Sequence, residues 1–275
     1  MRDLKIAAVS MSSETGKIEK NLERTASYVA KAAKMGADII CFPELSVTGY
    51  TLTHPASIYG RLRSEAIIER IVGMAREKGL LVIAGMVDLA EAEGPYIAQV
   101  VVGPAGMVGL YRKTHLSPPE KGIYAAGQEL GIFSYRHVTF GIQLCYESHF
   151  PELSTLMALR GAEIIFFPHA SPRGEPEEKM ESWMRHLPSR AFDNGLFLVA
   201  CNQVGKSGEG LSFPGVALAL NPAGRVMEAY CGHREEMILV KLSRDVLEEI
   251  RKHRMKYFLP NRRPELYGDI SSDSS

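Results

Sequence analysis

The 275-residue sequence repeats, approximately, a helix stop followed by a buried strand, and no other feature constrains its fold as much. Residues 36–44 read GADIICFPE and residues 161–169 read GAEIIFFPH, while residues 79–84 resemble residues 195–200. Buried apolar strands resemble one another, so chance similarity is the alternative explanation. If the repeat is genuine, two similar α/β halves each form a mixed sheet with helices on one face, and the two remaining faces pack together. We therefore predict a four-layer αββα sandwich of two mixed sheets with an internal pseudo-twofold axis.

Apolar periodicity places helices and strands in the alternating order that such a fold needs. Helical spacing over residues 18–33 and 67–75 ends at Gly36 and Gly79, and residues 103–106 form a hairpin turn. Two further helices are predicted, one opening at Pro151 and one running from about Ser243 to about His253. Strands are predicted at 6–9, 38–42, 80–84, 97–102, 107–111, 138–145, within 161–169, and at 195–200, 216–220, 225–229 and 237–241.

Composition favours one globular domain and excludes several kinds of partner. The chain has 32 basic and 32 acidic residues, so its net charge recommends neither nucleic acid nor an anionic membrane as a partner. No apolar run is long enough to span a membrane, and residues 1–5 lead into a strand without an apolar leader, so we expect no signal peptide. No composition break marks a linker, which predicts a single domain over residues 1–270 with a disordered serine-rich tail at 271–275.

The cysteines and histidines indicate a reduced, metal-free protein. Cys41, Cys145, Cys201 and Cys231 form no CxxC pair, and three of them lie in or beside strand-like runs, which suits free thiols in the cytoplasm. The eight histidines show no spacing typical of a metal site, and we expect no cofactor. Residues 204–207 read VGKS, but a phosphate loop needs a glycine where this chain has Ala200.

Cys145 occupies a position that suits a nucleophile. A β-branched, apolar run over residues 138–145 predicts a buried strand that ends at this cysteine, and a helix opens at Pro151. Backbone N–H groups and the dipole at a helix N-terminus favour a thiolate, so we expect an activated sulfur there. The alternative is a small apolar residue that completes a core strand, since free cysteines are often buried.

Two charged residues follow the ends of other predicted strands. Glu44 follows the run at 38–42 and Lys113 follows the run at 107–111. Because sites in α/β sheets gather at the carboxyl ends of strands, we group both with Cys145. Cys145 would attack an electrophilic carbon, Glu44 would accept the thiol proton, and Lys113 would hold the oxyanion together with a backbone N–H. The alternative is that both charged side chains are ordinary surface groups.

Three segments of the chain resemble the signature segments of the nitrilase superfamily of carbon–nitrogen hydrolases. They are residues 42–50, 111–116 and 144–152, and the likeness extends over nearly the whole chain. The resemblance implies an αββα sandwich, a homodimer or larger homo-oligomer, and cofactor-free hydrolysis of a small amide, carbamoyl compound or nitrile through a cysteine thioester.

The resemblance also assigns roles to residues. It implies Glu44 as general base, Lys113 as stabiliser of the tetrahedral intermediate and Cys145 as nucleophile. Glu120, seven residues after Lys113, matches a second glutamate that positions substrate and lysine. A further set is expected to contact the substrate: Tyr50 in the first segment, Tyr146 through its backbone N–H, and His169 at a strand end, where a buried structural histidine is the alternative.

Departures from the family pattern favour an amide substrate. Many amidases of the superfamily have aspartate where this chain has Glu147, and arginine where it has His149; in some relatives that arginine region holds a substrate carboxylate. True nitrilases have Cys-Trp-Glu where this chain has Cys145, Tyr146 and Glu147. The sequence leaves three alternatives open: nitrile hydrolysis, acyl transfer from the thioester to an amine, and an idle binding protein on the same fold.

Overall fold

Two six-stranded sheets lie face to face in the computed structural model, which describes residues 2–60, 63–90 and 94–271. The first sheet has the strand order β14-β1-β2-β3-β4-β5, and the second has the order β13-β12-β9-β8-β7-β6. The strands of the first sheet are β14 (Glu236–Leu242), β1 (Leu4–Ser10), β2 (Ile39–Cys41), β3 (Leu81–Ala90), β4 (Gly94–Gly103) and β5 (Gly106–Arg112). Those of the second are β13 (Val226–Gly232), β12 (Gly215–Leu220), β9 (Phe197–Asn202), β8 (Ile164–His169), β7 (Val138–Ile142) and β6 (Gly131–Tyr135).

The two sheets repeat the same pairing pattern, which confirms the internal repeat. In the first, β1, β2 and β3 pair in parallel, and β4, β5 and β14 add antiparallel neighbours at the two sides. In the second, β7, β8 and β9 pair in parallel, with β12, β13 and β6 in the corresponding antiparallel places. The repeated segments at 36–44 and 161–169 therefore form the equivalent strands β2 and β8. All four glycines that open the repeated segments adopt the left-handed φ that stops a helix.

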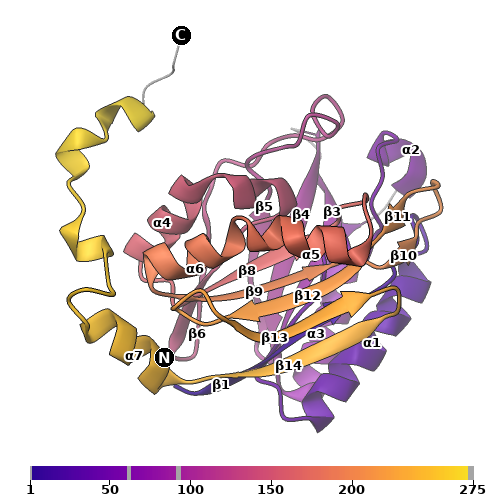
Figure 1. Ribbon diagram of the computed structural model, residues 1–275. Helices are drawn as coiled ribbons and strands as arrows, with labels where there is room; N and C mark the ends of the chain where they lie inside the picture. The colour runs from indigo at the N-terminus through magenta and orange to yellow at the C-terminus, as the bar shows by residue number, and fades with distance from the viewer. Residues whose placement is uncertain (1, 61–62, 91–93, 272–275) are drawn as a thin grey trace.

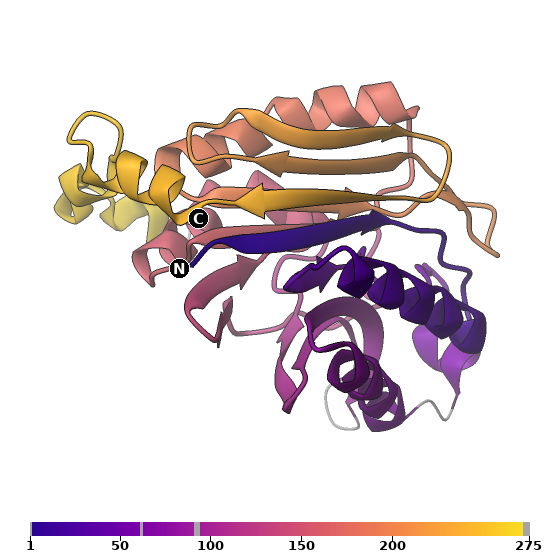
Figure 2. The same ribbon diagram turned by 90° about the horizontal axis from the view of Figure 1, so that it is seen from below.

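Helices cover the outer face of each sheet, giving the predicted αββα order (Figures 1 and 2). α1 (Ile18–Lys34) and α3 (Ser64–Lys78) pack on the first sheet, and α4 (Pro151–Leu159), α5 (Pro176–Met184) and α6 (Leu187–Asn194) pack on the second. Alternation along β1 shows how the layers are built. Ala7 and Val9 contact the α1 and α3 layer, whereas Ile6 and Ala8 face the core between the sheets.

Several elements differ from the sequence prediction. The strand expected to end at Cys145 ends at Ile142, because the chain there leaves the sheet for a 3₁₀ turn, η1 (Cys145–His149). Strand β6 and helices α2 (Pro55–Tyr59), α5 and α6 were not predicted. The last strand, β14, leaves its sequence neighbours and pairs antiparallel with β1, so the chain closes back onto the first sheet.

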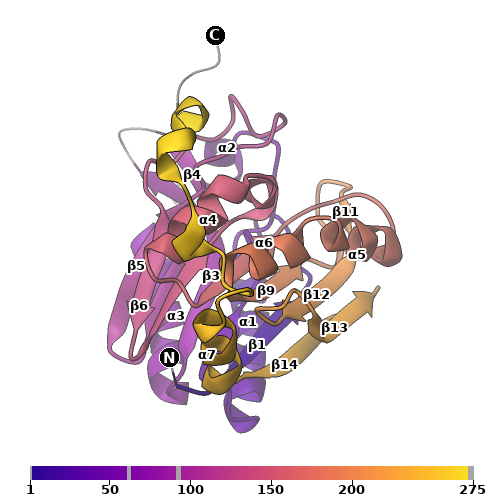
Figure 3. The same cartoon turned by 60° about the vertical axis from the view of Figure 1, so that its left-hand side comes forward.

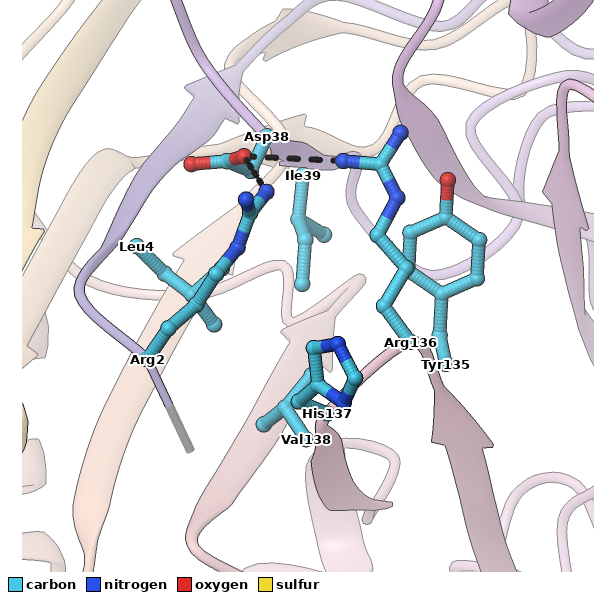
Figure 4. A pocket seen from close by; sticks show the side chains of 8 residues that line it. All are labelled: Arg2, Leu4, Asp38, Ile39, Tyr135, Arg136, His137 and Val138. Atoms are coloured by element: carbon cyan, nitrogen blue, oxygen red, sulfur yellow. Dashed lines mark hydrogen bonds and ion pairs between the residues drawn. The ribbon is translucent and has the colours of Figure 1, made fainter.

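An ion-pair cluster ties the two sheets together far from the strand ends discussed below. Asp38, just before β2, binds Arg2 at 2.7 Å and Arg136 of the β6–β7 turn at 3.8 Å, as Figure 4 shows. The adjoining cavity, with Tyr135 and His137 in its lining, is very small and contains no residue of the predicted site. We therefore treat this cluster as structural.

After β14 the chain forms α7 (Arg244–Lys252) and then three 3₁₀ turns, η2 (Leu259–Asn261), η3 (Pro264–Leu266) and η4 (Gly268–Ser271). Leu259 of η2 is buried in the core of the second sheet and its helices, and η3 and η4 then extend away from the sandwich (Figure 3). The predicted disordered tail begins at Ser271, where η4 ends, and residues 272–275 lie outside the described residues. Across the part of the chain that the structure describes, no helix combines the length and apolarity required to cross a bilayer.

Candidate active site

Three strand ends bring Glu44, Lys113 and Cys145 to one place between the sheets. Glu44 follows β2 by three residues, Lys113 follows β5 directly, and Cys145 opens η1 three residues after β7. The first two come from one sheet and the cysteine from the other. The grouping expected from strand-end placement is therefore present in the structure, although β7 is shorter than predicted.

A fully buried cluster of charges forms the floor of the site. The Nζ atom of Lys113 donates to Oε1 of Glu44 at 2.8 Å and to Oε1 of Glu120 at 2.9 Å, and all three side chains are buried. The second oxygen of Glu44 accepts the backbone N–H of Ala170 at 2.9 Å. An ammonium has three donors, and two are occupied here, so the third N–H of Lys113 has no partner among the described residues.

Glu120 binds Lys113 from a turn that follows β5. Its Oε2 atom accepts the backbone N–H of Ser117 at 2.7 Å, which closes the turn that carries it. Its Oε1 atom accepts the hydroxyl of Tyr50 at 3.5 Å as well as the Lys113 ammonium. Glu120 therefore accepts three hydrogen bonds and holds the ammonium of Lys113 in place.

A cavity of about 660 Å³ opens beside this floor. Five of the seven predicted site residues line it, and the other two, Glu44 and Lys113, are buried against Glu120 at its base. The five that line the cavity are Tyr50, Glu120, Cys145, Tyr146 and His169. The structure thus brings together every residue singled out from the sequence.

The backbone of Cys145 is held in an unusual conformation. Its φ is 41°, in the left-handed region that residues with a side chain rarely adopt. Such strain persists only where surrounding contacts fix the chain, and it is common at functional sites. The turn presents the sulfur at the cavity wall instead of continuing β7 into the core, which answers the alternative of a simple core cysteine.

Glu147 holds this turn in place, and sequence reasoning treated it only as a departure from the family pattern. Its carboxylate is fully buried and accepts the backbone N–H of Leu144 at 2.6 Å. The other oxygen accepts the hydroxyls of Tyr111 and Thr114, each at 2.6 Å, and the backbone N–H of Thr114 at 2.8 Å. Glu147 therefore joins the segment that carries Lys113 to the segment that carries Cys145. The available signal was a carboxylate two residues after the nucleophile in an otherwise buried stretch.

Electrostatics at the site contradict the expectation of a resting thiolate. Burial and the Glu44 carboxylate together raise the pKa of the Cys145 thiol to about 12, against the lowering effect of Lys113. Burial likewise raises the pKa of Glu44 to about 7, against the lowering effect of Lys113. The pKa of Lys113 is raised well above its usual value, since the Glu44 and Glu120 carboxylates outweigh burial. The thiol is neutral at rest, and its neighbour Glu44 is poised to exchange a proton near neutral pH.

His169 is a neutral ring at the cavity wall. Its Nδ1 atom lies 2.9 Å from the carbonyl oxygen of Phe167, and because a carbonyl only accepts, Nδ1 carries the proton and Nε2 is an acceptor. Burial lowers its pKa well below the usual value. The ring packs on Trp183 of α5 with centroids 4.6 Å apart. The structural and the substrate-facing interpretations of His169 are therefore both compatible with its position.

Helix α5 contributes a wall of the cavity that the sequence did not reveal. The apolar pattern predicts no helix in this region, but α5 begins at Pro176, and Lys179, Ser182 and Trp183 of this helix line the cavity. Charged residues interrupt the short apolar pattern of α5, so the periodicity of the sequence does not predict this helix.

Taken by itself, this arrangement can perform nucleophilic acyl chemistry. A thiol lies at a cavity wall, a carboxylate with a near-neutral pKa can take its proton, and a fixed ammonium with a free N–H can stabilise a developing oxyanion.

Comparisons with known proteins point the same way. The family described as carbon-nitrogen hydrolase matches residues 5–252. The chain is 28% identical over 271 residues to a protein of Pyrococcus abyssi named nitrilase, covering 96% of this chain and 99% of that one. It is 29% identical over 270 residues to an (R)-stereoselective amidase of a Pseudomonas species, covering 97% and 94%. The crystal structure of an amidase from a Nesterenkonia species matches with a TM-score of 0.82 at 25% identity, covering 97% and 96% of the two chains.

Proposed function

Because this chain belongs to the carbon–nitrogen hydrolase family, we propose that it releases ammonia from small amides through a thioester on Cys145, with Glu44 as general base and Lys113 as oxyanion stabiliser. One observation carries the assignment of roles. Lys113 is buried between Glu44 and Glu120 at the base of the cavity that Cys145 lines, with one N–H left for a ligand.

The first half-reaction forms the thioester. Glu44 accepts the thiol proton as the sulfur attacks the amide carbon, and the carbonyl oxygen becomes an oxyanion that the free N–H of Lys113 and the backbone N–H of Tyr146 stabilise. The C–N bond then breaks, and Glu44 returns its proton to the nitrogen, which leaves as ammonia. A near-neutral pKa suits Glu44 to both transfers.

The second half-reaction hydrolyses the thioester. Glu44, again ionised, takes a proton from a water molecule as its oxygen attacks the thioester carbon, and the same donors stabilise the second oxyanion. The C–S bond breaks, the sulfur recovers the proton from Glu44, and the carboxylic acid product leaves. Transfer to an amine in place of water would use the same thioester.

Ammonia release from a panel of small amides, carbamoyl compounds and nitriles tests this proposal. We expect release from one or more amides, none from Cys145→Ala, and an acyl adduct on Cys145 in the intact mass of enzyme stopped during turnover. Circular dichroism of the variant controls for folding. Turnover by Cys145→Ala equal to that of the unaltered enzyme would overturn the proposal, as would activity on nitriles alone.

Self-association is part of the same proposal. The part of the chain after η2 extends away from the sandwich (Figure 3). Leu266 in this part is 62% accessible, and Met255, between α7 and η2, is 78% accessible. Such side chains favour packing against a second copy of the chain. Light scattering should give a dimer or larger species, and removal of residues 253–275 should reduce it. A monomer at micromolar concentration would contradict the proposal.

We also propose a cytoplasmic location, on the ground that all four cysteines are free thiols. Cys41 and Cys201 are both buried in the core, with the sulfur of Cys201 3.8 Å from the carbonyl oxygen of Cys41. Localisation of a tagged chain by cell fractionation tests this directly.

A further inference from the structure

One cation in the cavity has no part in the mechanism above. Lys179, on α5, lines the same cavity as Cys145, and its side chain is partly buried. Its Nζ atom donates to Oγ of Ser171 at 2.6 Å, and it forms no ion pair within the described part of the chain. A partly desolvated ammonium with no opposite charge is unfavourable, and burial lowers the pKa of Lys179 accordingly.

The backbone of Ser171, whose hydroxyl accepts the hydrogen bond from Lys179, is held in place by Asn202. Asn202, fully buried at the end of β9, accepts the backbone N–H of Ser171 at 2.9 Å and donates to its carbonyl oxygen at 3.2 Å. A second bond anchors the amide of Asn202 to the carbonyl of Pro214 at 2.8 Å. The ammonium is therefore held at a defined place in the cavity and is not a freely rotating surface lysine.

A second cation lies beside the first at the rim. Arg173 lines the cavity, is exposed, and forms no hydrogen bond or ion pair with any residue in the described ranges. Its charge lowers the pKa of Lys179, so the two cations repel each other. Its φ of 136° is strongly unfavourable for a residue with a side chain, and such strain is common at ligand sites.

The lining formed by the described residues offers no free carboxylate to offset these charges. Glu120 is the only carboxylate among those residues, and its oxygens already accept from Lys113, Tyr50 and Ser117. Two histidines of the lining, His149 and His186, stack at 4.7 Å, and burial lowers the pKa of both, so they are uncharged near neutral pH. Lys179 and Arg173 are therefore charged groups of the described cavity lining that no carboxylate of that lining pairs with.

We propose that the substrate is an amide that carries a carboxylate at its far end, and that Lys179 binds this carboxylate with Arg173 assisting at the rim. A monoamide of a short dicarboxylic acid has this chemistry. Lys179 and Cys145 line the same cavity of about 660 Å³, so one small molecule can contact both. This inference rests on the proposed function, because it takes the amide carbon to lie at Cys145.

Matched substrates test the inference through activity. The probes are the monoamides of succinic, glutaric and adipic acid, each paired with a neutral amide in which an isopropyl group replaces the carboxylate. For one or more chain lengths we expect kcat/KM to favour the anionic member by at least about tenfold, as expected for a charged hydrogen bond. Lys179→Met should lower that ratio at least about tenfold, and Lys179→Arg should retain part of it. Lys34→Met, which removes an exposed lysine on α1, should leave the ratio unchanged.

Binding to an inactive enzyme separates this inference from the proposed function. Calorimetry of the Cys145→Ala variant should show that the preferred monoamide binds at least about tenfold more weakly when Lys179 is also replaced by methionine. If no amide is hydrolysed yet this difference in affinity is found, the proposed function fails and the carboxylate site stands. Equal affinity in the two variants, or hydrolysis that favours the neutral amides, overturns the carboxylate site and leaves amide hydrolysis intact.

Discussion

The floor of the cavity and its α5 wall each carry a lysine, but the two lysines have different partners. On the floor, Lys113 is fully buried and bound by two carboxylates at 2.8 and 2.9 Å. On the wall, Lys179 is partly buried, and among the described residues its ammonium is bound by a hydroxyl and by no carboxylate. On the floor, the protein itself supplies the carboxylates that pair with its lysine. On the wall, the inference above assigns that part to the substrate.

The comparison also explains why the thiol is neutral at rest. The floor holds two carboxylates against one ammonium, so its field favours protonated sulfur, and burial acts in the same direction. In the proposed mechanism, deprotonation of Cys145 therefore accompanies attack on the substrate, and Glu44 receives the proton. This arrangement protects a cavity-lining thiol from nonspecific reaction until a substrate is bound.

Lys113→Met should have the largest effect, because it breaks the floor in both structure and chemistry. We expect a loss of about 3–5 kcal/mol in the free energy of unfolding, since Glu44 and Glu120 would be left as unpaired buried carboxylates. Turnover should fall by at least about a hundredfold through loss of the oxyanion donor. Urea denaturation and ammonia release measure the two effects, with Lys34→Met as the control. A variant as stable as the unaltered chain would show that Glu44 and Glu120 do not depend on the charge of Lys113.

Glu44→Gln should separate chemistry from structure on the same floor. Glutamine keeps the shape of the side chain and leaves Lys113 paired with Glu120, so we expect a folded protein with turnover reduced about 10²–10⁴-fold. The matched control is Glu65→Gln on the exposed face of α3. Turnover within about threefold of normal would remove Glu44 from the role of general base.

The pH dependence on a neutral amide should report the floor alone. Glu44 must be ionised to act as a base, and its pKa is raised to about 7, so kcat/KM should fall about tenfold per pH unit as pH decreases below about 7. A neutral substrate excludes titration of the ligand. A rate that is flat from pH 7 to pH 5 would mean that the carboxylate titrates near its ordinary value.

Glu147→Gln should loosen the link between the two halves of the floor. The amide can still accept from Leu144 or from Thr114, but it is neutral and offers one acceptor oxygen in place of two. We expect kcat to decrease about tenfold, with a smaller change in KM, because the nucleophile and Lys113 lose their fixed spacing. Steady-state kinetics on one neutral amide give both values. A change confined to KM would assign Glu147 to substrate binding instead.

Arg173→Gly should change stability least, and it tests whether Arg173 helps to bind a carboxylate at the α5 wall. Glycine accepts a φ of 136°, so removing the strain should raise the free energy of unfolding by about 1 kcal/mol. The preference for anionic amides should fall at the same time. Lower stability together with an unchanged preference would show that Arg173 is a structural residue with no role at the cavity.

Much of the floor was readable from the sequence because each residue lies next to a recognisable strand. The apolar runs before them placed Glu44, Lys113 and Cys145 at or near strand ends. The resemblance added four further residues: Glu120, Tyr50, Tyr146 and His169. The wall was not readable. α5 has only nine residues, and whether Lys179 faces a cavity or solvent depends on how that helix packs on the second sheet.

The sequence by itself determined the layered α/β architecture, its internal repeat and the side chains to which the proposed mechanism assigns roles. These follow from local signals: apolar periodicity, glycines that stop helices, and residue types placed where strands end. Only the tertiary structure decided the state of the charges. Burial and neighbours distant in the chain set the pKa of Cys145 and of Glu44. They also set the hydrogen bonds of Glu120, and they leave Lys179 without a carboxylate partner among the described residues. Desolvation and Coulomb interactions act through space, and the order of residues does not specify them.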